Sequence, residues 1–564
     1  MAKQGTVQPA RSRSCLTTLV LSIILASVAC VIAVAFLLRD PDEDTPPSIT
    51  TNRREVGLAL AYSPEKAAIL TALVDDFNAS RTELPNGKRV VVSATSISPD
   101  QMATGAATNA FHAVSPDSSI WLTEIDRHWS ARVPEGGALV GETTRYMVSP
   151  VVIAMWEDVA TGLGYPDANL GWKDLLNAAA NDPQFKWSHP STNSASGLLS
   201  TLALFYAGAG TQRDLTEELA TAQSTLDYVE ALEKTVRYYG EGELAVMQQI
   251  EEKGRTYLDA FVVQEQLLVD YNQRYGRQLV AIYPFEGTLW EDHPLALLEH
   301  PDRTDDERLA YQAFRDYLLS ADVQKRILTA GYRPTDLSID LNQVGSPISA
   351  TNGADPSQPS TTLQIPSAAV IEVVRNAWQY TKRRANIFLV VDVSGSMEGA
   401  NIEQERLALQ AFLDQIQSDQ ERVGLILFAS NVYEAVPLTL VSDGRAELSQ
   451  AFSGLTAGGN TALLDGVNAA VTKLVDLNDG ERINAIVAMT DGKENSSSVS
   501  LQQLTRKLQA QAGTDLPVVV FCIAYGRGAD YSALSALAEA SGGFAREGDT
   551  ATIQDLYKVL STYF

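Results

Sequence analysis

Apolar residues in the last third of the chain fall into short runs separated by stretches of helical periodicity. The runs at 386–391, 423–428, 485–490 and 518–523 carry no charge and are rich in Val, Ile and Leu. Continuous runs of this kind predict strands that are buried on both faces. Residues 404–417 place apolar side chains on one helical face, which predicts an amphipathic helix. The alternation predicts a doubly wound, mostly parallel sheet with α/β architecture.

A second region of alternating strands and helices precedes this one and covers residues 56–335. It opens with an apolar strand at 56–61. Ser63 and the proline after it form a good helix start, because serine can cap and proline suits the first turn. The apolar run at 146–156 predicts a crossover into a second lobe, and we expect the chain to return near 280–288.

Residues 336–383 separate the two regions and are expected to act as a linker. Residues 336–366 are rich in Ser, Pro, Thr, Gly and Asn, a composition that predicts a flexible tether. A short amphipathic stretch at 368–380 then leads into the last domain, 384–564. Within that domain we expect one antiparallel edge strand near 432–440.

The N-terminal part carries an uncharged apolar segment of 23 residues, 16–38. This is long enough to span a bilayer. Basic residues lie in the short N-terminus, 1–15, and acidic residues crowd the linker at 39–55. The positive flank predicts a single-pass anchor in the cell membrane, with a cytoplasmic N-terminus and an extracytoplasmic bulk. A cleaved secretory signal, or a lipoprotein modified at Cys30, fits less well because the run is long and stays apolar after that cysteine.

Composition limits the classes of function. At 564 residues, with 45% hydrophobic and 20% charged residues, the chain should form more than one domain. Its formal net charge of −26 disfavours nucleic-acid binding, because phosphate backbones are repelled. The three cysteines predict no disulfide, and the five histidines are scattered. No phosphate-binding loop, H-E-x-x-H or G-x-S-x-G motif is present, so we expect no catalytic residues and no enzyme activity.

Oxygen-bearing side chains follow two of the predicted strands in the last domain. Asp392, Ser394 and Ser396 form a D-x-S-x-S turn directly after one strand, and Asp491 ends another. Thr461 lies in a glycine-rich loop between them. Side chains beyond the carboxyl ends of parallel strands share one edge of a sheet, where ligands bind. Two carboxylates and three hydroxyls suit a hard divalent cation, although Asp and Ser after a strand can also simply cap a helix.

These three segments together resemble the metal-ion-dependent adhesion site of von Willebrand factor A (VWA) domains, over roughly residues 384–564. The resemblance implies a Rossmann-like fold in which both serines and Thr461 ligate the metal through hydroxyl oxygens. Asp392 and Asp491 would act directly or through water. Mg²⁺ is the expected ion, with Ca²⁺ and Mn²⁺ as alternatives. The open coordination position would accept an Asp or Glu carboxylate from a protein partner.

Residues 56–335 resemble a bacterial extracellular solute-binding protein of the two-lobed periplasmic kind. The segments that carry this resemblance are 56–66, 116–121, 144–156, 185–197, 280–288 and 331–334. The resemblance implies two α/β lobes, a hinge and a cleft that holds a small-molecule or anionic solute at helix N-termini, which attract anions. The candidate ligand-binding residues are Ser63, Ser118, Ser119, Ser191, Ser194 and Glu286. Helix capping is the alternative role of these serines.

We therefore interpret the chain as a membrane-anchored extracytoplasmic binding protein with two modules. The alternative is the solute-binding component of an ABC-type transport system with an accessory VWA domain. A hydrolase with a hidden serine nucleophile is disfavoured because no serine has a paired base. A chelatase-like or chaperone partner of an ATPase is disfavoured by the outward topology.

Overall fold

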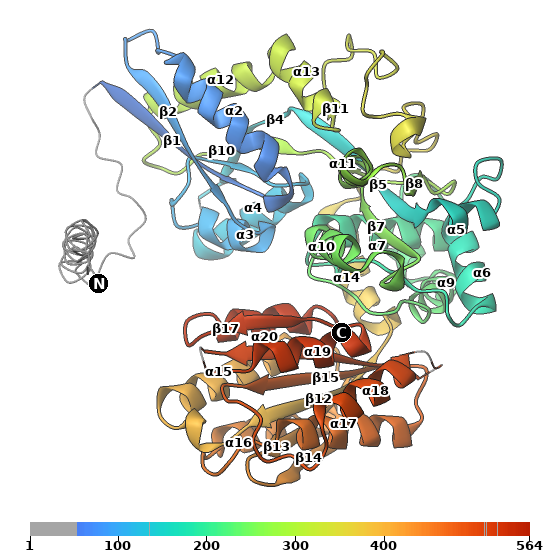
Figure 1. Cartoon of the computed structure of the whole chain (residues 1–564). Helices are drawn as coiled ribbons and strands as arrows, with labels where there is room; N and C mark the ends of the chain where they lie inside the picture. Colours follow the sequence, from blue (N-terminus) through green and yellow to red (C-terminus); the bar gives the residue numbers. More distant parts are fainter. Residues whose placement is uncertain (1–53, 135, 513, 515, 527) are drawn as a thin grey trace, which may run out of the picture.

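The computed structural model describes residues 54–134, 136–512, 514, 516–526 and 528–564. The predicted membrane anchor at 16–38 lies outside these residues, as does most of the linker at 39–55. Within the described part of the chain, no helix has the length and apolar character needed to cross a membrane. The described chain forms two α/β lobes and a third α/β domain (Figure 1).

The first lobe is a five-stranded sheet in the order β2-β1-β3-β10-β4. Its strands are β1 (Glu55–Tyr62), β2 (Arg89–Ser96), β3 (Ala113–Ser115), β4 (Val140–Arg145) and β10 (Pro294–Leu298). The helices α2 (Ala67–Ser80), α12 (Asp305–Leu318) and α13 (Ala321–Thr329) cover one face, and α3 (Pro99–Ala106) and α4 (Ile120–Arg132) the other. The strand at 56–61 and the helix after it are therefore confirmed.

The second lobe is built around β5 (Met147–Trp156), all but one of whose ten residues are buried. The other strands are β6 (Trp187–Ser188), β7 (Ala260–Gln264), β8 (Leu279–Ile282), β9 (Trp290–Glu291) and β11 (Arg333–Pro334). The helices are α5 (Glu157–Gly162), α6 (Trp172–Asn181), α7 (Ala195–Ala209), α8 (Glu217–Thr221), α9 (Gln223–Glu233), α10 (Glu243–Lys253) and α11 (Glu265–Tyr275).

Three chain crossings join the lobes: from β4 to β5, from β9 to β10, and from α13 to β11. The predicted crossover at 146–156 is confirmed. The predicted return near 280–288 falls too early, because β8 still pairs with β5 and the chain crosses only between Glu291 and Pro294.

The third domain is a six-stranded sheet in the order β14-β13-β12-β15-β16-β17. Its strands are β12 (Ala385–Asp392), β13 (Arg422–Phe428), β14 (Val432–Leu440), β15 (Ile483–Thr490), β16 (Val518–Tyr525) and β17 (Ala545–Gly548). The helices α15 (Ala400–Gln415), α16 (Val441–Ser453) and α20 (Ile553–Ser561) cover one face, and α17 (Leu463–Leu477), α18 (Leu501–Ala512) and α19 (Tyr531–Ser541) the other. Every pairing is parallel except that of β14 at the edge. The predicted doubly wound sheet and its antiparallel edge strand are confirmed.

The segment expected to be a flexible tether is instead packed on the second lobe. Ile348, Ala354 and Leu363 are buried, and the N–H of Leu363 donates to the carbonyl of Thr288 at 2.8 Å. Ser, Pro and Gly also dominate ordered loops, so composition alone did not distinguish the two. The helix α14 (Ala368–Thr381) follows and packs on α7, α8 and α9.

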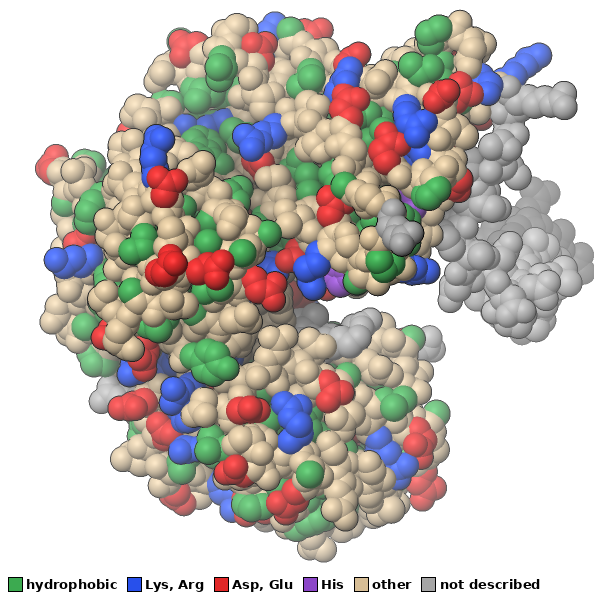
Figure 2. Space-filling model, turned by 180° about the vertical axis from the view of Figure 1, so that it is seen from behind, with side chains coloured by type: hydrophobic (Ala, Val, Ile, Leu, Met, Phe, Trp, Pro, Cys, Tyr) green, Lys and Arg blue, Asp and Glu red, His purple; other side chains and the backbone are tan. Residues whose placement is uncertain are grey.

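The third domain and the second lobe share one continuous hydrophobic core. Trp378 of α14 and the C-terminal Phe564 are both buried within it. The N–H of Tyr239 donates to the carbonyl of Tyr563 at 3.4 Å. Seen from behind, charged side chains of both signs are mixed over the surface (Figure 2), so the net negative charge does not form one continuous acidic face on that side.

Candidate functional site

The first candidate site lies at the carboxyl ends of β12 and β15, which pair in parallel. The register aligns Val391 with Met489, so Asp392 and Thr490 leave the sheet side by side. One Asp392 oxygen accepts the N–H of Ser394 at 2.7 Å, and the other accepts the Thr490 hydroxyl. Asp392 is fully buried, and these bonds hold the turn that carries the two serines.

The side chains of the turn continue to Asp491 through hydrogen bonds. The hydroxyls of Ser394 and Ser396 are 3.0 Å apart, and Ser396 donates to Asp491 Oδ1 at 2.5 Å. Asn401 donates to the other oxygen of Asp491 at 2.8 Å. Ser394 is buried whereas Ser396 is exposed, so the arrangement opens to solvent on the Ser396 side.

Thr461 joins the same group from the glycine-rich loop. The N–H of Gly395 donates to the carbonyl of Gly459 at 3.0 Å, which fixes this loop against the serine turn. A methyl group on Gly492 would lie 3.1 Å from the Thr461 hydroxyl and 3.2 Å from that of Ser396. Both hydroxyls therefore face the same small space, and the glycine leaves it open.

All five predicted metal-site residues thus converge, and they fit a hard cation because every donor is oxygen. The pKa of Asp392 is raised above its usual value, mainly by burial and also by the charge of Asp491. The hydrogen bonds from Thr490 and Ser394 oppose this rise. A bound cation would offset both the burial and the repulsion between the two carboxylates. Among the residues described, no three or more His, Cys, Asp or Glu side chains group as metal ligands, so a cation held here would also need the hydroxyl oxygens.

Three residues that support the site were not predicted from the sequence. Thr490 and Asn401 hold the two aspartates, and the Asn495 amide oxygen accepts the N–H of Thr461 at 2.9 Å. Thr490 directly precedes Asp491, so its place at the strand end was a usable signal. The asparagines act across the fold, and nothing local in the sequence indicates it.

Several of the predicted solute-binding residues make hydrogen bonds at helix starts. Ser194 caps α7 by accepting the N–H of Gly197 at 3.2 Å, and Ser118 accepts the N–H of Ile120 at 3.4 Å near the start of α4. Ser119 precedes α4 without a side-chain cap. Capping therefore accounts for two of these serines.

The remaining candidates also have structural roles. Ser63 does not cap the next helical turn but donates to the carbonyl of Ser115 at 3.4 Å. Glu286 accepts the N–H groups of Trp172 and Lys173, each at 3.2 Å, and so caps α6.

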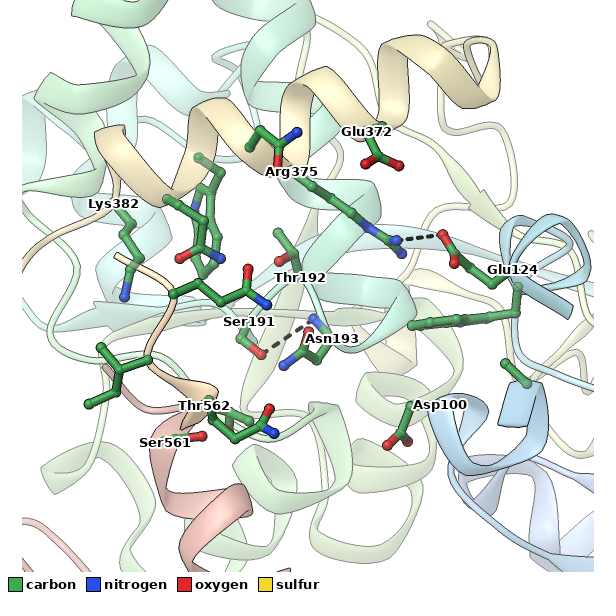
Figure 3. Close-up of a pocket in the computed structure, with 18 of the residues that line it drawn as sticks. Asp100, Glu124, Ser191, Thr192, Asn193, Glu372, Arg375, Lys382, Ser561 and Thr562 are labelled. Carbon is green, nitrogen blue, oxygen red and sulfur yellow. Dashed lines mark hydrogen bonds and ion pairs between the residues drawn. The ribbon is translucent and has the colours of Figure 1, made fainter. Parts of the chain in front are cut away.

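Ser191 lines a cavity of about 590 Å³ between the lobes and the third domain. Figure 3 shows Ser191, Thr192 and Asn193 beneath α14, whose Arg375 reaches across to Glu124 of the first lobe. That ion pair measures 2.6 Å. The cavity is therefore walled by α14, which links the two modules.

The described chain therefore combines two α/β lobes with a Rossmann-like third domain that carries the oxygen cluster. Family models identify both modules. Residues 386–559 are a von Willebrand factor type A domain, and residues 58–333 are a bacterial extracellular solute-binding domain.

Curated relatives match only part of the chain. The inter-alpha-trypsin inhibitor heavy chain H4 of Homo sapiens is 30% identical over 187 residues, which cover 31% of this chain and 20% of that protein. Heavy chain H3 of Mus musculus is 28% identical over 169 residues, covering 28% and 19%. The chain thus spans about a fifth of the length of these relatives.

Solved structures are similar to each module separately. A von Willebrand factor type A protein from Catenulispora acidiphila is 21% identical, covers 32% of this chain and 43% of its own, and has a TM-score of 0.29. The sulfate-binding protein SubI from Mycobacterium tuberculosis H37Rv is 20% identical, covers 50% and 88%, and has a TM-score of 0.36. Proximal thread matrix protein 1 from the mussel byssus, solved with a zinc-occupied MIDAS motif, is 18% identical, covers 32% and 47%, and has a TM-score of 0.27.

Proposed function

We propose that this chain is a membrane-anchored extracytoplasmic binding protein, and not an enzyme, whose VWA domain binds a divalent cation and through it a protein partner. The observation that carries the proposal is the hydrogen-bonded group of Ser394, Ser396 and Asp491, together with the Ser396 and Thr461 hydroxyls that face the space beside Gly492. The anchor rests on the sequence of residues 16–38.

The donor set explains how a cation could recruit a partner. Ser394, Ser396 and Thr461 are neutral donors, so an ion held mainly by them keeps much of its positive charge. Because Ser396 is exposed, an incoming carboxylate from an Asp or Glu can reach the ion from solvent. Mg²⁺ is the proposed physiological ion, because it keeps open or water-filled positions in oxygen sites.

A peptide-display selection on the full chain in Mg²⁺ tests the partner class. We expect enriched peptides to carry an essential Asp or Glu and to be released by excess chelator. Asp392→Ala should lose this binding while the domain stays folded, as judged by circular dichroism. Peptides that remain bound in chelator, or bind equally well after Asp→Asn and Glu→Gln replacement, would contradict the proposal.

Two further parts of the proposal are tested separately. Membrane fractionation should recover the full chain with membranes, and a chain lacking residues 16–38 should not be retained there. The transport alternative is not favoured by the comparisons. It predicts that a permease, and not an acidic peptide, is the binding partner of the solute-binding module.

A further inference from the structure

Four carboxylates gather where the two lobes meet, far from the VWA site. Glu65 lies in the first turn before α2, Asp117 follows β3, Glu243 opens α10 and Glu291 ends β9 at a lobe crossing. We call these four residues the acidic cleft cluster. They come from the first lobe, the second lobe and the crossing, and their charges act on one another: burial and the neighbouring carboxylates raise the pKa of Asp117, Glu243 and Glu291.

One ammonium group faces this cluster. The Lys66 Nζ is buried and donates to the carbonyls of Ser115 at 3.0 Å and Pro116 at 2.6 Å. Burial lowers its pKa to about 8, and Glu65, Asp117, Glu291 and Asp292 oppose that shift. Four carboxylates against one ammonium leave an excess of three negative charges when all are ionised.

The nearby arginines are already paired. Arg145 forms an ion pair with Asp292 at 2.8 Å, and Arg333 forms one with Glu265 at 2.6 Å. His293 lies with its Nε2 4.0 Å from Glu291, but burial and the charge of Lys66 hold its pKa well below the usual value, so it stays neutral. Uncompensated buried carboxylates are strongly unfavourable, so without a ligand these groups keep protons, as their raised pKa values indicate. A positive charge from outside the chain would take the place of those protons.

The buried polar atoms that lack hydrogen-bond partners also favour a positively charged ligand. Among the described residues, neither carboxylate oxygen of Glu291 has a partner, although the side chain is fully buried. The Oε1 atoms of Glu65 and Gln264 are also unpartnered, and Gln264 contacts Glu243 through its own amide N–H. Both ring nitrogens of His293 lack partners as well. Unused acceptors outnumber unused donors, so a fitting ligand must bring N–H groups.

An anionic solute, the expectation from helix N-termini, does not fit this cleft. The start of α10 already holds a carboxylate, because Glu243 is its first residue and accepts the N–H of Gln264 at 2.9 Å. A sulfate or carboxylate ligand would add negative charge and further acceptors to the cluster. Tyr332, whose ring lies 5.1 Å from that of His293, adds an aromatic surface of the kind that cations favour.

We propose that the cleft between the lobes binds an aliphatic amine with more than one ammonium group. Each –NH₃⁺ brings three donors and one charge, which matches the excess of acceptors and of negative charge in the acidic cleft cluster. A bare metal ion is disfavoured because the four carboxylates, although their charges act on one another, are not grouped closely enough for three of them to ligate one ion. The proposal deepens the solute-binding half of the proposed function and does not depend on the VWA metal site.

Isothermal titration calorimetry on the full chain tests this, with spermidine and putrescine as probes and sulfate, L-glutamate and Mg²⁺ as comparison ligands. We expect an amine to bind and the two anions not to bind. Glu291→Gln should weaken amine binding at least tenfold, because it removes one charge and keeps the shape. Glu251→Gln, which changes an exposed carboxylate on α10, should leave amine binding unchanged.

Further variants keep the test decisive. Glu243→Gln serves as the second cleft variant if Glu291→Gln does not fold, and it should also weaken amine binding at least tenfold. Asp392→Ala should lose Mg²⁺ binding but keep amine binding, so failure of either proposal can be told from failure of the other. Binding of sulfate in place of the amines, or amine affinity unchanged in both cleft variants, would overturn the proposal.

Discussion

The space above Gly492 offers a way to block the VWA site without removing any proposed ligand. Gly492→Ala would place a methyl group 3.1 Å from the Thr461 hydroxyl and 3.2 Å from the Ser396 hydroxyl. Both distances are shorter than ordinary van der Waals contacts of a methyl group, so the methyl takes the space that an ion would need. Gly458→Ala is the matched control, because a methyl group there meets no heavy atom within 4 Å.

The size of the effect follows from binding linkage. A ligand at one hundred times its dissociation constant stabilises the folded state by about 2.7 kcal/mol. For a domain of about 150 to 250 residues, each kcal/mol shifts the melting temperature by roughly 2–4 °C. Saturating Mg²⁺ should therefore raise the melting temperature of the VWA domain by roughly 5–10 °C in the natural chain.

Differential scanning calorimetry with Mg²⁺ and with chelator measures this increment directly. We expect the increment to disappear in Gly492→Ala and to persist in Gly458→Ala, while both variants melt near the natural chain in chelator. An undiminished Mg²⁺ increment in Gly492→Ala would show that the ion does not occupy the space between Thr461 and Ser396.

Two further predictions concern stability and the contact between modules. Burial raises the pKa of Glu405 to about 8, although Tyr557 donates a hydrogen bond to it at 2.7 Å. Its neutral form therefore contributes stability that is fully present below about pH 4.5 and lost as the pH rises through about 8. Between pH 5 and pH 9 the free energy of unfolding in urea should fall by a few kcal/mol less in Glu405→Gln than in the natural chain. Equal pH dependence in both proteins would contradict this prediction. Arg375→Ala breaks the 2.6 Å ion pair to Glu124, so hydrogen exchange in α4 should accelerate by at least twofold. Arg127→Ala is the control, because its pair with Glu124 lies within α4 and its loss should leave the contact with α14 intact. Unchanged exchange in the Arg375 variant would show that the pair does not join α14 to the first lobe.

The sequence predicted the VWA domain and its oxygen cluster because both follow from local patterns. Each buried strand is a continuous apolar run, and Asp392 and Asp491 directly end two of them. Parallel pairing in register then brings these ends together without any further information. The antiparallel edge at 432–440 was predictable for the same reason.

The acidic cleft cluster could not be predicted, because its meaning depends on burial. Glu65, Asp117, Glu243 and Glu291 are far apart in the sequence, and each alone resembles a solvated surface carboxylate. Only the meeting of the lobes buries these carboxyls, wholly or in part, beside the ammonium group of Lys66. The expectation of an anionic solute rested on the helix starts, and the sequence does not show which side chains lie against them.

Packing between modules was equally hidden in the sequence. Residues 336–366 have a composition shared by flexible linkers and by ordered loops. Their order comes from contacts with the second lobe, such as the hydrogen bond from Leu363 to Thr288. Those contacts depend on the fold of residues that precede them by several elements, and no local pattern reports them.

An anomalous difference map from crystals of the chain soaked in Mn²⁺ would locate the cation that we propose for Ser394, Ser396, Thr461 and the two aspartates, since manganese scatters anomalously and can replace magnesium. We expect a strong peak within bonding distance of the Ser394 and Ser396 hydroxyls. A map without a peak there, or with the manganese bound only elsewhere, would show that these residues do not hold a divalent cation.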